Sequence, residues 1–93
     1  MIISFGTKET ALIWDVSRVA KLPVEIQETA RRKLRMLNNS QNLTDLKIPP
    51  ANRLEKLKEA LKDYYSIRIN DQWRIIFKWN NGNALQVEII DYH

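Results

Sequence analysis

The chain has 93 residues, with no cysteine and one histidine, and its 15 Lys+Arg against 11 Asp+Glu give a formal net charge of +4. A chain this short predicts a single domain over residues 1–93 with one modest core, and it excludes the large cofactor-binding folds. The composition excludes a disulfide framework, a thiolate nucleophile and a Cys/His zinc site, and no apolar run reaches the roughly 20 residues of a membrane span. Since no signal-peptide pattern begins the chain, we expect a cytoplasmic protein without a membrane partner.

The first half of the chain predicts a short edge strand followed by two helices. Residues 1–5 are apolar and are expected to join a larger sheet. Thr7 suits the N-cap of a first helix, whose apolar residues recur at helical spacing. A second helix is predicted to begin at Pro23 and to end at Asn38-Asn39-Ser40, before a connecting loop over residues 41–53. Its core face is predicted to contain Ile26, Ala30, Leu34 and Leu37.

The last third changes from a period of 3.6 to a period of two, which predicts three sequential strands. The short connections between them require antiparallel pairing, so we expect a meander packed on the two helices and an α+β fold class. Trp73 and Trp79 share the face of Ile75 and Phe77, which favours a place in the core. The places of Tyr64 and Tyr65 stay open.

The register of the meander follows from keeping the apolar sets in phase, which favours three-residue loops at 70–72 and 80–82. These loops place the following pairs opposite each other: Phe77 and Leu85, Ile75 and Val87, Arg74 and Glu88, Arg68 and Arg74. Two facing arginines destabilise a sheet by up to about 1 kcal/mol. Either Glu88 neutralises them in an ion network on a solvated face, or this face binds an anion.

Basic residues are concentrated after residue 30. Residues 1–30 contain three basic and four acidic side chains, a net charge of −1, whereas residues 31–93 contain 12 basic and seven acidic side chains, a net charge of +5. A cationic surface favours a polyanionic partner such as nucleic acid, although proteins without such a partner share this balance.

The sequence is most specific after residue 65. It reads Ser-Ile-Arg-Ile-Asn-Asp-Gln-Trp-Arg-Ile over residues 66–75 and Asp91-Tyr92-His93 at its end. In these motifs the chain resembles the HigB toxins of the RelE/ParE superfamily of bacterial toxin–antitoxin systems, and it is similar to them in length and element order throughout. The resemblance implies a small curved antiparallel sheet with two N-terminal helices packed on one face, in agreement with the periodicity.

The activity that the resemblance implies is ribosome-dependent cleavage of messenger RNA in the decoding site. RNA is cut when a 2′-OH attacks the adjacent phosphate, which needs a base, a cation that stabilises the phosphorane and an acid for the departing 5′-oxygen. This chemistry needs no metal or cofactor, and we expect none. The family's active-site residues fall on Lys58, Arg74, Asp91, Tyr92 and His93, while Arg68, Lys56 and Lys78 are expected to bind RNA.

Each of these residue types suits a part of the reaction. Arg74 and Lys58 would hold and neutralise the scissile phosphate, because arginine offers a fixed fork of donors. His93 is the expected proton carrier, since an ordinary histidine titrates at about pH 6.5, and Asp91 could orient it or act as base. Tyr92 could stack on an RNA base or donate a proton. The assignment of acid and base among these three residues stays open.

Two positions depart from the family pattern. Many relatives have a Gly-Asp-Arg-x-Gly turn after the lysine, where this chain reads Glu59-Ala60-Leu61-Lys62-Asp63, so residues 53–63 look helix-permissive. Some relatives have a catalytic histidine three residues before the lysine, where this chain has Glu55. A carboxylate there could act as a base, but it also repels RNA. Both departures favour reduced activity or a different cleavage preference.

The leading function is therefore a ribosome-dependent mRNA endonuclease toxin that inhibits translation in the bacterial cytoplasm. The resemblance implies a HigA-type antitoxin with a helix-turn-helix domain as partner, and indirect binding of operator DNA through that antitoxin. The alternative is a catalytically weak RelE-fold module that acts mainly as antitoxin partner and transcriptional corepressor. A gyrase poison of the ParE branch is disfavoured, because ParE-type chains lack the Asp-Tyr-His ending.

Overall fold

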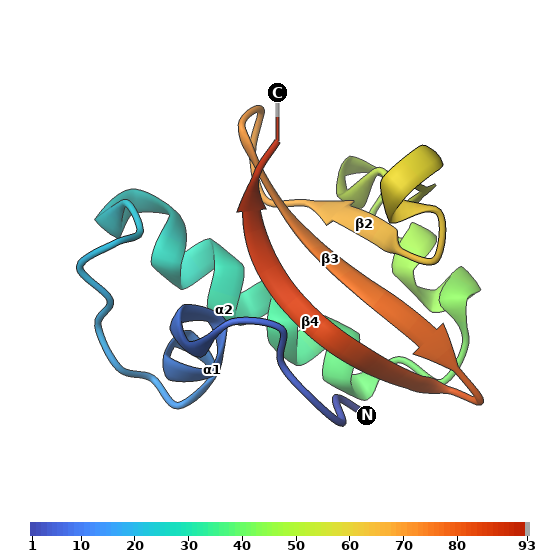
Figure 1. Cartoon of the computed structure of the whole chain (residues 1–93), viewed down its shortest axis with the longest axis horizontal. Helices are drawn as coiled ribbons and strands as arrows, with labels where there is room; N and C mark the ends of the chain where they lie inside the picture. Colours follow the sequence, from blue (N-terminus) through green and yellow to red (C-terminus); the bar gives the residue numbers. More distant parts are fainter. Residues whose placement is uncertain (93) are drawn as a thin grey trace.

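The structure is a computed structural model in which residues 1–92 are described (Figure 1). The helices are α1 (Lys8–Trp14) and α2 (Val24–Asn39), with short 3-10 helices η1 (Leu43–Lys47), η2 (Pro50–Asn52) and η3 (Glu59–Leu61). The strands are β1 (Glu55–Lys56), β2 (Tyr65–Arg68), β3 (Trp73–Asn80) and β4 (Asn83–Asp91). They form one antiparallel sheet in the order β1-β2-β3-β4, which confirms the α+β prediction.

The helix ends follow the local signals in the sequence. The Thr10 backbone N–H donates to the Thr7 hydroxyl at 3.3 Å, so Thr7 is the predicted N-cap of α1. Helix α2 begins at Val24, one residue after the predicted start, with Pro23 as its N-cap, and it ends at Asn39 with Ser40 as C-cap. Within residues 1–92, no helix has the length and apolar character needed to cross a membrane.

The core lies between the two helices and one face of the sheet, with α2 behind β3 and β4 in the view of Figure 1. The four predicted core residues of α2 are all buried, and they share one cluster with Ile67, Ile75 and Phe77 of the sheet. Burying such a side chain contributes about 1.5–3 kcal/mol. Trp73 and Trp79 are partly buried against this cluster, as predicted.

The register between β2 and β3 is the predicted one. Arg68 lies opposite Arg74, and the Ile69 backbone N–H donates to the Trp73 carbonyl oxygen at 2.9 Å. The sheet therefore does place the two arginines opposite each other, so their positive charges require neutralising partners.

The predicted register between β3 and β4 is wrong. Asn80 pairs with Asn83, so the loop has two residues, Asn81 and Gly82, with φ of 51° and 80°. Positive φ at both positions is typical of a type I′ hairpin turn, which Asn-Gly favours. The register then shifts between Ile76 and Lys78, where Gln86 on the partner strand has φ of 53°.

This shift removes the predicted partner of Arg74. Beyond it, Ile76 lies opposite Glu88 and Arg74 lies opposite Ile90. The expected pairing of Arg74 with Glu88 is therefore wrong, because the two-residue turn and the extra residue in β4 each move the partner of Arg74 by one residue. The same extra residue restores the alternation, so that Val87 and Ile89 are buried in the core.

Two other segments differ from the sequence-based expectation. Residues 1–5 join the sheet beside β4 through isolated parallel bridges, Ile2 with Ala84 and Phe5 with Val87, without forming a regular strand. Residues 53–63 looked helix-permissive but contain the two-residue strand β1 and the turn η3. Strand β1 pairs Glu55 with Ser66 and Lys56 with Tyr65, which brings this segment onto the sheet.

Candidate active site

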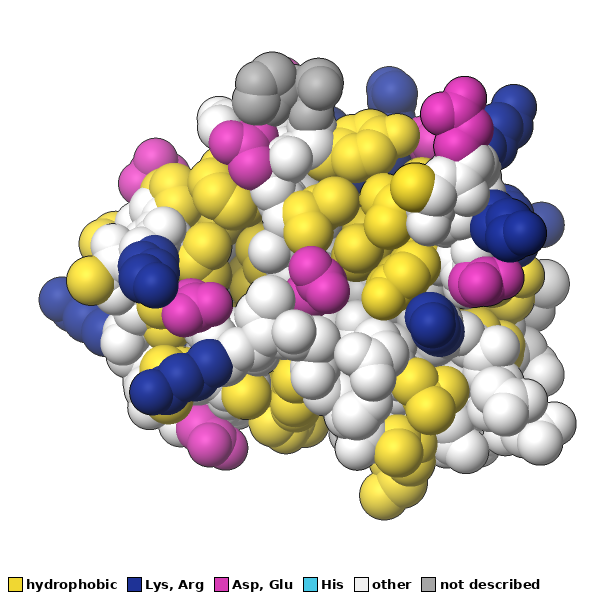
Figure 2. Space-filling model, in the orientation of Figure 1, with side chains coloured by type: hydrophobic (Ala, Val, Ile, Leu, Met, Phe, Trp, Pro, Cys, Tyr) yellow, Lys and Arg dark blue, Asp and Glu magenta, His cyan; other side chains and the backbone are white. Residues whose placement is uncertain are grey.

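The face of the sheet away from α2 carries the polar side chains of β2 and β3. Ser66 and Arg68 alternate with the core residue Ile67, and Arg74 precedes the core residue Ile75, so these three polar residues point away from the helices. In Figure 2, which is viewed from the side opposite α2, hydrophobic side chains gather over the strands, and basic and acidic side chains surround them. This face offers both apolar contact and charge.

A cavity of about 320 Å³ opens beside β1. It is lined by Glu55, Lys56, Leu57, Lys58, Glu59, Leu61 and Tyr92. The fold thus brings Lys58 and Tyr92, two predicted active-site residues, to the same wall, and adds Lys56 to them. In the part of the chain that the structure describes, no three His, Cys, Asp or Glu side chains are grouped so as to hold a metal ion.

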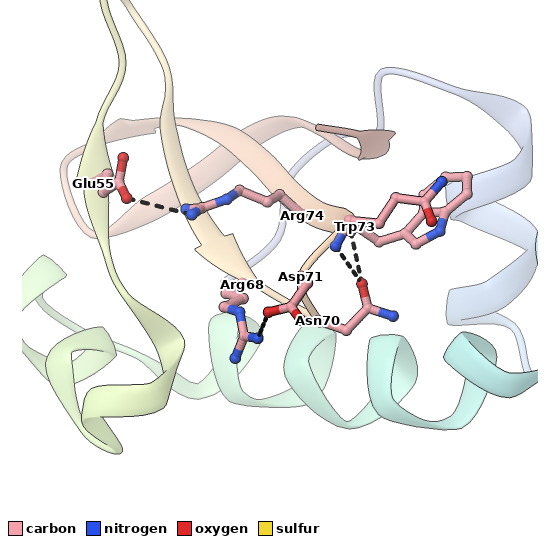
Figure 3. A network of polar contacts seen from close by, with 7 residues as sticks. Glu55, Arg68, Asn70, Asp71, Trp73 and Arg74 are labelled. Atoms are coloured by element: carbon pink, nitrogen blue, oxygen red, sulfur yellow. Dashed lines mark hydrogen bonds and ion pairs between the residues drawn. The ribbon is translucent and has the colours of Figure 1, made fainter. Parts of the chain in front are cut away.

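Three contacts fix the guanidinium of Arg74 beside this cavity. Its Nη1 donates to the Ser66 hydroxyl at 3.0 Å. Its Nη2 lies 3.4 Å from Glu55 Oε1, a contact that Figure 3 shows. Its central carbon lies 4.9 Å from the centroid of the Tyr92 ring. Ser66 is fully buried, and the Arg74 side chain is only 12% exposed. An arginine held on three sides is oriented before an anion arrives, which lowers the cost of binding one.

Glu55 is the site residue that the sequence did not assign. It occupies the position that Glu88 was expected to take as the acidic neighbour of Arg74, and it does so because β1 pairs it with Ser66. A two-residue strand has no measurable period, so no hydrophobic pattern could have found this pairing. The only signal was the carboxylate at a position where some relatives have histidine.

The C-terminal residues of the predicted site are tied to the β2–β3 turn. Gln72 Nε2 donates to Asp91 Oδ2 at 3.0 Å, and the Tyr92 backbone N–H donates to the Gln72 carbonyl oxygen at 2.6 Å. Asp91 lies opposite Trp73, one residue from Arg74. The structure therefore brings Asp91 and Tyr92 to the end of the sheet where Arg74 lies. His93, the fifth predicted catalytic residue, lies outside the described residues.

The three predicted RNA-binding residues are placed differently. Arg68 forms an ion pair with Asp71, as Figure 3 shows, and Lys78 Nζ lies 5.4 Å from the centroid of the Tyr64 ring. Lys56 lies on the cavity wall, with its Nζ 5.2 Å from the centroid of the Tyr65 ring. Arg68 and Lys78 do not line the cavity, so they extend the cationic surface along the sheet without entering the pocket.

A buried lysine supports the segment that carries Glu55. Lys33 of α2 donates to the Asn52 side chain, which is fully buried and in turn donates to the Leu46 carbonyl oxygen at 3.1 Å. Burial lowers the pKa of Lys33 from its ordinary 10.5, and the positive charges of Arg32 and Arg68 lower it further. These contacts anchor η2 to α2. Asn52, the last residue of η2, lies three residues before Glu55 in the chain.

Two N-terminal helices followed by an open four-stranded antiparallel sheet are consistent with the fold of RelE-like toxins. Residues 10–93 match the family described as "RelE-like toxin of type II toxin-antitoxin system HigB". Because the match covers most of the chain, the chain belongs to the HigB family, and the resemblance noted in the sequence is confirmed.

Two relatives show how far this similarity extends. The chain is 45% identical over 71 residues to "Toxin HigB-1" of Vibrio cholerae, covering 76% of this chain and 75% of the relative. It is 27% identical over 93 residues, the full length of both proteins, to "Endoribonuclease HigB" of Proteus vulgaris. The likeness to the second protein covers every position of the predicted site.

Proposed function

We propose that this toxin is an endoribonuclease that cleaves messenger RNA in the decoding site of the ribosome. The observation that carries the proposal is the guanidinium of Arg74, held by Ser66, Glu55 and Tyr92 at the edge of a cavity that also contains Lys58. Membership of a type II toxin family and the name of the Proteus vulgaris relative support it.

The proposed reaction uses the chain's own side chains. Arg74 and Lys58 bind the scissile phosphate and stabilise the charge that develops on its oxygens, and removing one such donor typically costs about 10²–10³ in rate. Tyr92 stacks on a nucleobase or donates a hydrogen bond from its hydroxyl group. Asp91 and His93 supply proton transfer, with Gln72 holding the Asp91 carboxylate at 3.0 Å.

The surface around the cavity fits a polyanion in part. Lys56 and Lys58 line the cavity, while Arg68 and Lys78 lie farther along the sheet, and each can contact a phosphate of a bound strand. Glu55 and Glu59 line the same cavity and oppose RNA. These carboxylates favour the second candidate function, a catalytically weak toxin that acts mainly as antitoxin partner and corepressor.

The proposed partner is a HigA-type antitoxin with a helix-turn-helix domain, through which the complex reaches operator DNA. We expect co-expression of such an antitoxin to restore growth to cells that produce the toxin. The ribosome and its bound mRNA are the proposed targets.

Controlled expression followed by mapping of mRNA 5′ ends tests the activity. The proposal predicts growth arrest with cuts that follow the codon phase, and loss of these cuts in His93→Ala and Arg74→Ala. Lys21→Ala serves as the control, because it removes an exposed positive charge from the α1–α2 connection and leaves the cavity unchanged. Intact mRNA in cells with an active pool of translating ribosomes would contradict the endonuclease and favour the corepressor.

A further inference from the structure

We infer that the cavity beside β1 binds a guanine base and that the carboxylate of Glu59 reads the Watson–Crick edge of this base. The inference rests on the proposed ribonuclease function and deepens it, because it names the base that the toxin selects in the RNA strand. Three features support it: the walls of the cavity, the unpaired carboxylate of Glu59, and the backbone conformation at that residue.

The cavity has the size and the walls of a nucleobase site. Its volume of about 320 Å³ lies within the range of about 300–1,000 Å³ for small-ligand pockets. Leu57 and Leu61 provide apolar walls, and Tyr92, which is 37% exposed, adds an aromatic ring. Proteins recognise single-stranded RNA by stacking a base on such a ring and hydrogen-bonding its edge. The centroid of the Tyr92 ring lies 4.9 Å from the central guanidinium carbon of Arg74, so a base in the cavity lies beside the proposed phosphate site.

The carboxylate of Glu59 is available to the edge of a base. Glu59 lines the cavity and is exposed. Within residues 1–92, no ion pair or hydrogen bond involves its side chain, whereas Glu55 is paired with Arg74. An ionised carboxylate accepts hydrogen bonds through both of its oxygens and donates none. A ligand with two adjacent donors is therefore its best match.

Guanine is the RNA base that presents two adjacent donors, N1–H and the N2 amino group, on its Watson–Crick edge. Adenine and cytosine each place an amino group beside an acceptor nitrogen, and uracil places its N3–H between two carbonyl oxygens. A carboxylate repels those acceptors, but with guanine it forms two parallel charge-assisted hydrogen bonds. The negative charge of Glu59, which opposes a phosphate, thus favours guanine over the other bases.

The backbone at Glu59 has a strained conformation. Its φ is 57°, in the left-handed region that is unfavourable for a residue with a Cβ. Glycine, which many relatives have at this position, adopts that conformation without cost. Strained residues cluster at active sites and ligand clamps, where the surrounding structure maintains them. The Lys62 backbone N–H donates to the Glu59 carbonyl oxygen at 3.1 Å, so the turn η3 holds the strained residue at the cavity wall.

Single-turnover cleavage by the full-length toxin, on ribosomes programmed with A-site codons that differ in one base, tests the inference. We expect the wild type to cleave about tenfold faster when guanine occupies one position of the codon, in the lower part of the range for a bidentate contact because Glu59 is exposed to water. Glu59→Gln keeps the size of the side chain and adds a donor beside its acceptor, which matches adenine. Its preference should therefore move from guanine to adenine.

A matched control separates base recognition from charge. Glu25→Gln removes one negative charge from the exposed first turn of α2, so it should keep the wild-type preference. If Glu59 only repels phosphate, Glu59→Gln will cleave every codon faster by the same factor, which overturns the inference. A wild type without a preference for guanine, or a Glu59→Gln variant that keeps this preference, also overturns it.

Binding of GMP and AMP to the full-length chain, measured by NMR titration without ribosomes, separates the inference from the proposed function. We expect the wild type to bind GMP about tenfold more tightly than AMP, and Glu59→Gln to lose this difference. If the wild type cleaves no mRNA but still selects GMP, the proposed function is refuted and the cavity is a site for a free guanine nucleotide. Equal binding of GMP and AMP by the wild type overturns the inference.

Discussion

Replacing Arg74 with lysine tests whether the guanidinium acts through its fork or only through its charge. The arginine donates from Nη1 to Ser66 at 3.0 Å while its Nη2 lies 3.4 Å from Glu55. A lysine has one nitrogen at the end of a flexible chain and cannot occupy both positions. Arg74→Lys therefore keeps the charge and loses the fixed orientation.

The size of the effect follows from the contacts. A hydrogen bond that involves a charged group contributes about 1.5–3 kcal/mol, and the Arg74 side chain is only 12% exposed, so water replaces the lost contact poorly. If the bound phosphate depends on that orientation only in the transition state, the loss appears in the rate. At 1.36 kcal/mol per tenfold change, the cleavage rate constant falls by about 10- to 150-fold.

The assay combines single-turnover cleavage with the salt dependence of RNA binding. We expect Arg74→Lys to keep the wild-type slope of log affinity against log salt, because it still neutralises a phosphate. Arg74→Ala should lower that slope by about 0.7, the value for one contact to a single strand. If Arg74→Lys cleaves as fast as the wild type, the argument from the fork is refuted. If the wild type and Arg74→Ala have the same slope of log affinity against log salt, the phosphate contact is refuted.

Three further predictions concern stability and are read from urea unfolding. Val16 has φ of 66° and is 71% exposed, so Val16→Gly should relieve left-handed strain and stabilise the fold by about 1 kcal/mol; a loss of stability would contradict this. Gly82 has φ of 80°, and an added Cβ would lie 3.2 Å from the Gln41 carbonyl oxygen. Gly82→Ala should therefore destabilise the fold by about 1 kcal/mol or more. An unchanged urea midpoint would contradict the turn geometry. The pKa of Lys33 is lower in the folded state than its ordinary 10.5, so the unfolded chain binds more protons than the folded chain between these two values. The free energy of unfolding of the wild type, relative to that of Lys33→Met, should therefore rise with pH across that window. A difference that does not change with pH would contradict burial of the charge.

The parts of the fold that the sequence predicted are those where one local signal acts alone. Thr7 caps α1, and Leu34 and Leu37 lie on the buried stripe of α2. The β3–β4 register failed because two departures from regular pairing occur together. A two-residue Asn81-Gly82 turn changes the phase, and the bulge at Gln86 changes it back, so the alternation of apolar residues looks the same as with a regular three-residue loop.

The sequence likewise identified some residues of the site and did not assign another. Arg74, Tyr92 and Asp91 lie on long strands or directly after them, and their strong motif marked them as candidates. Glu55 lies on a strand too short to leave a pattern, and its contact with Arg74 depends on the tertiary pairing of β1 with Ser66. Residues that reach a site through such short segments carry no periodic signal. For Glu55 the sequence offered only its position in the family pattern, and the assembled sheet shows its contact with Arg74.

The two facing arginines acquire different properties from their separate acidic partners. Arg68 is paired with Asp71, three residues along the chain, and the Asp71 side chain is 98% exposed, so water and salt screen that ion pair strongly. A phosphate can therefore replace Asp71 with little loss. Arg74 is held by a buried serine as well as by Glu55, so it keeps its orientation when a phosphate arrives. Under the proposed function, Arg68 adds affinity along the RNA strand, whereas Arg74 fixes the position of the phosphate that is cut.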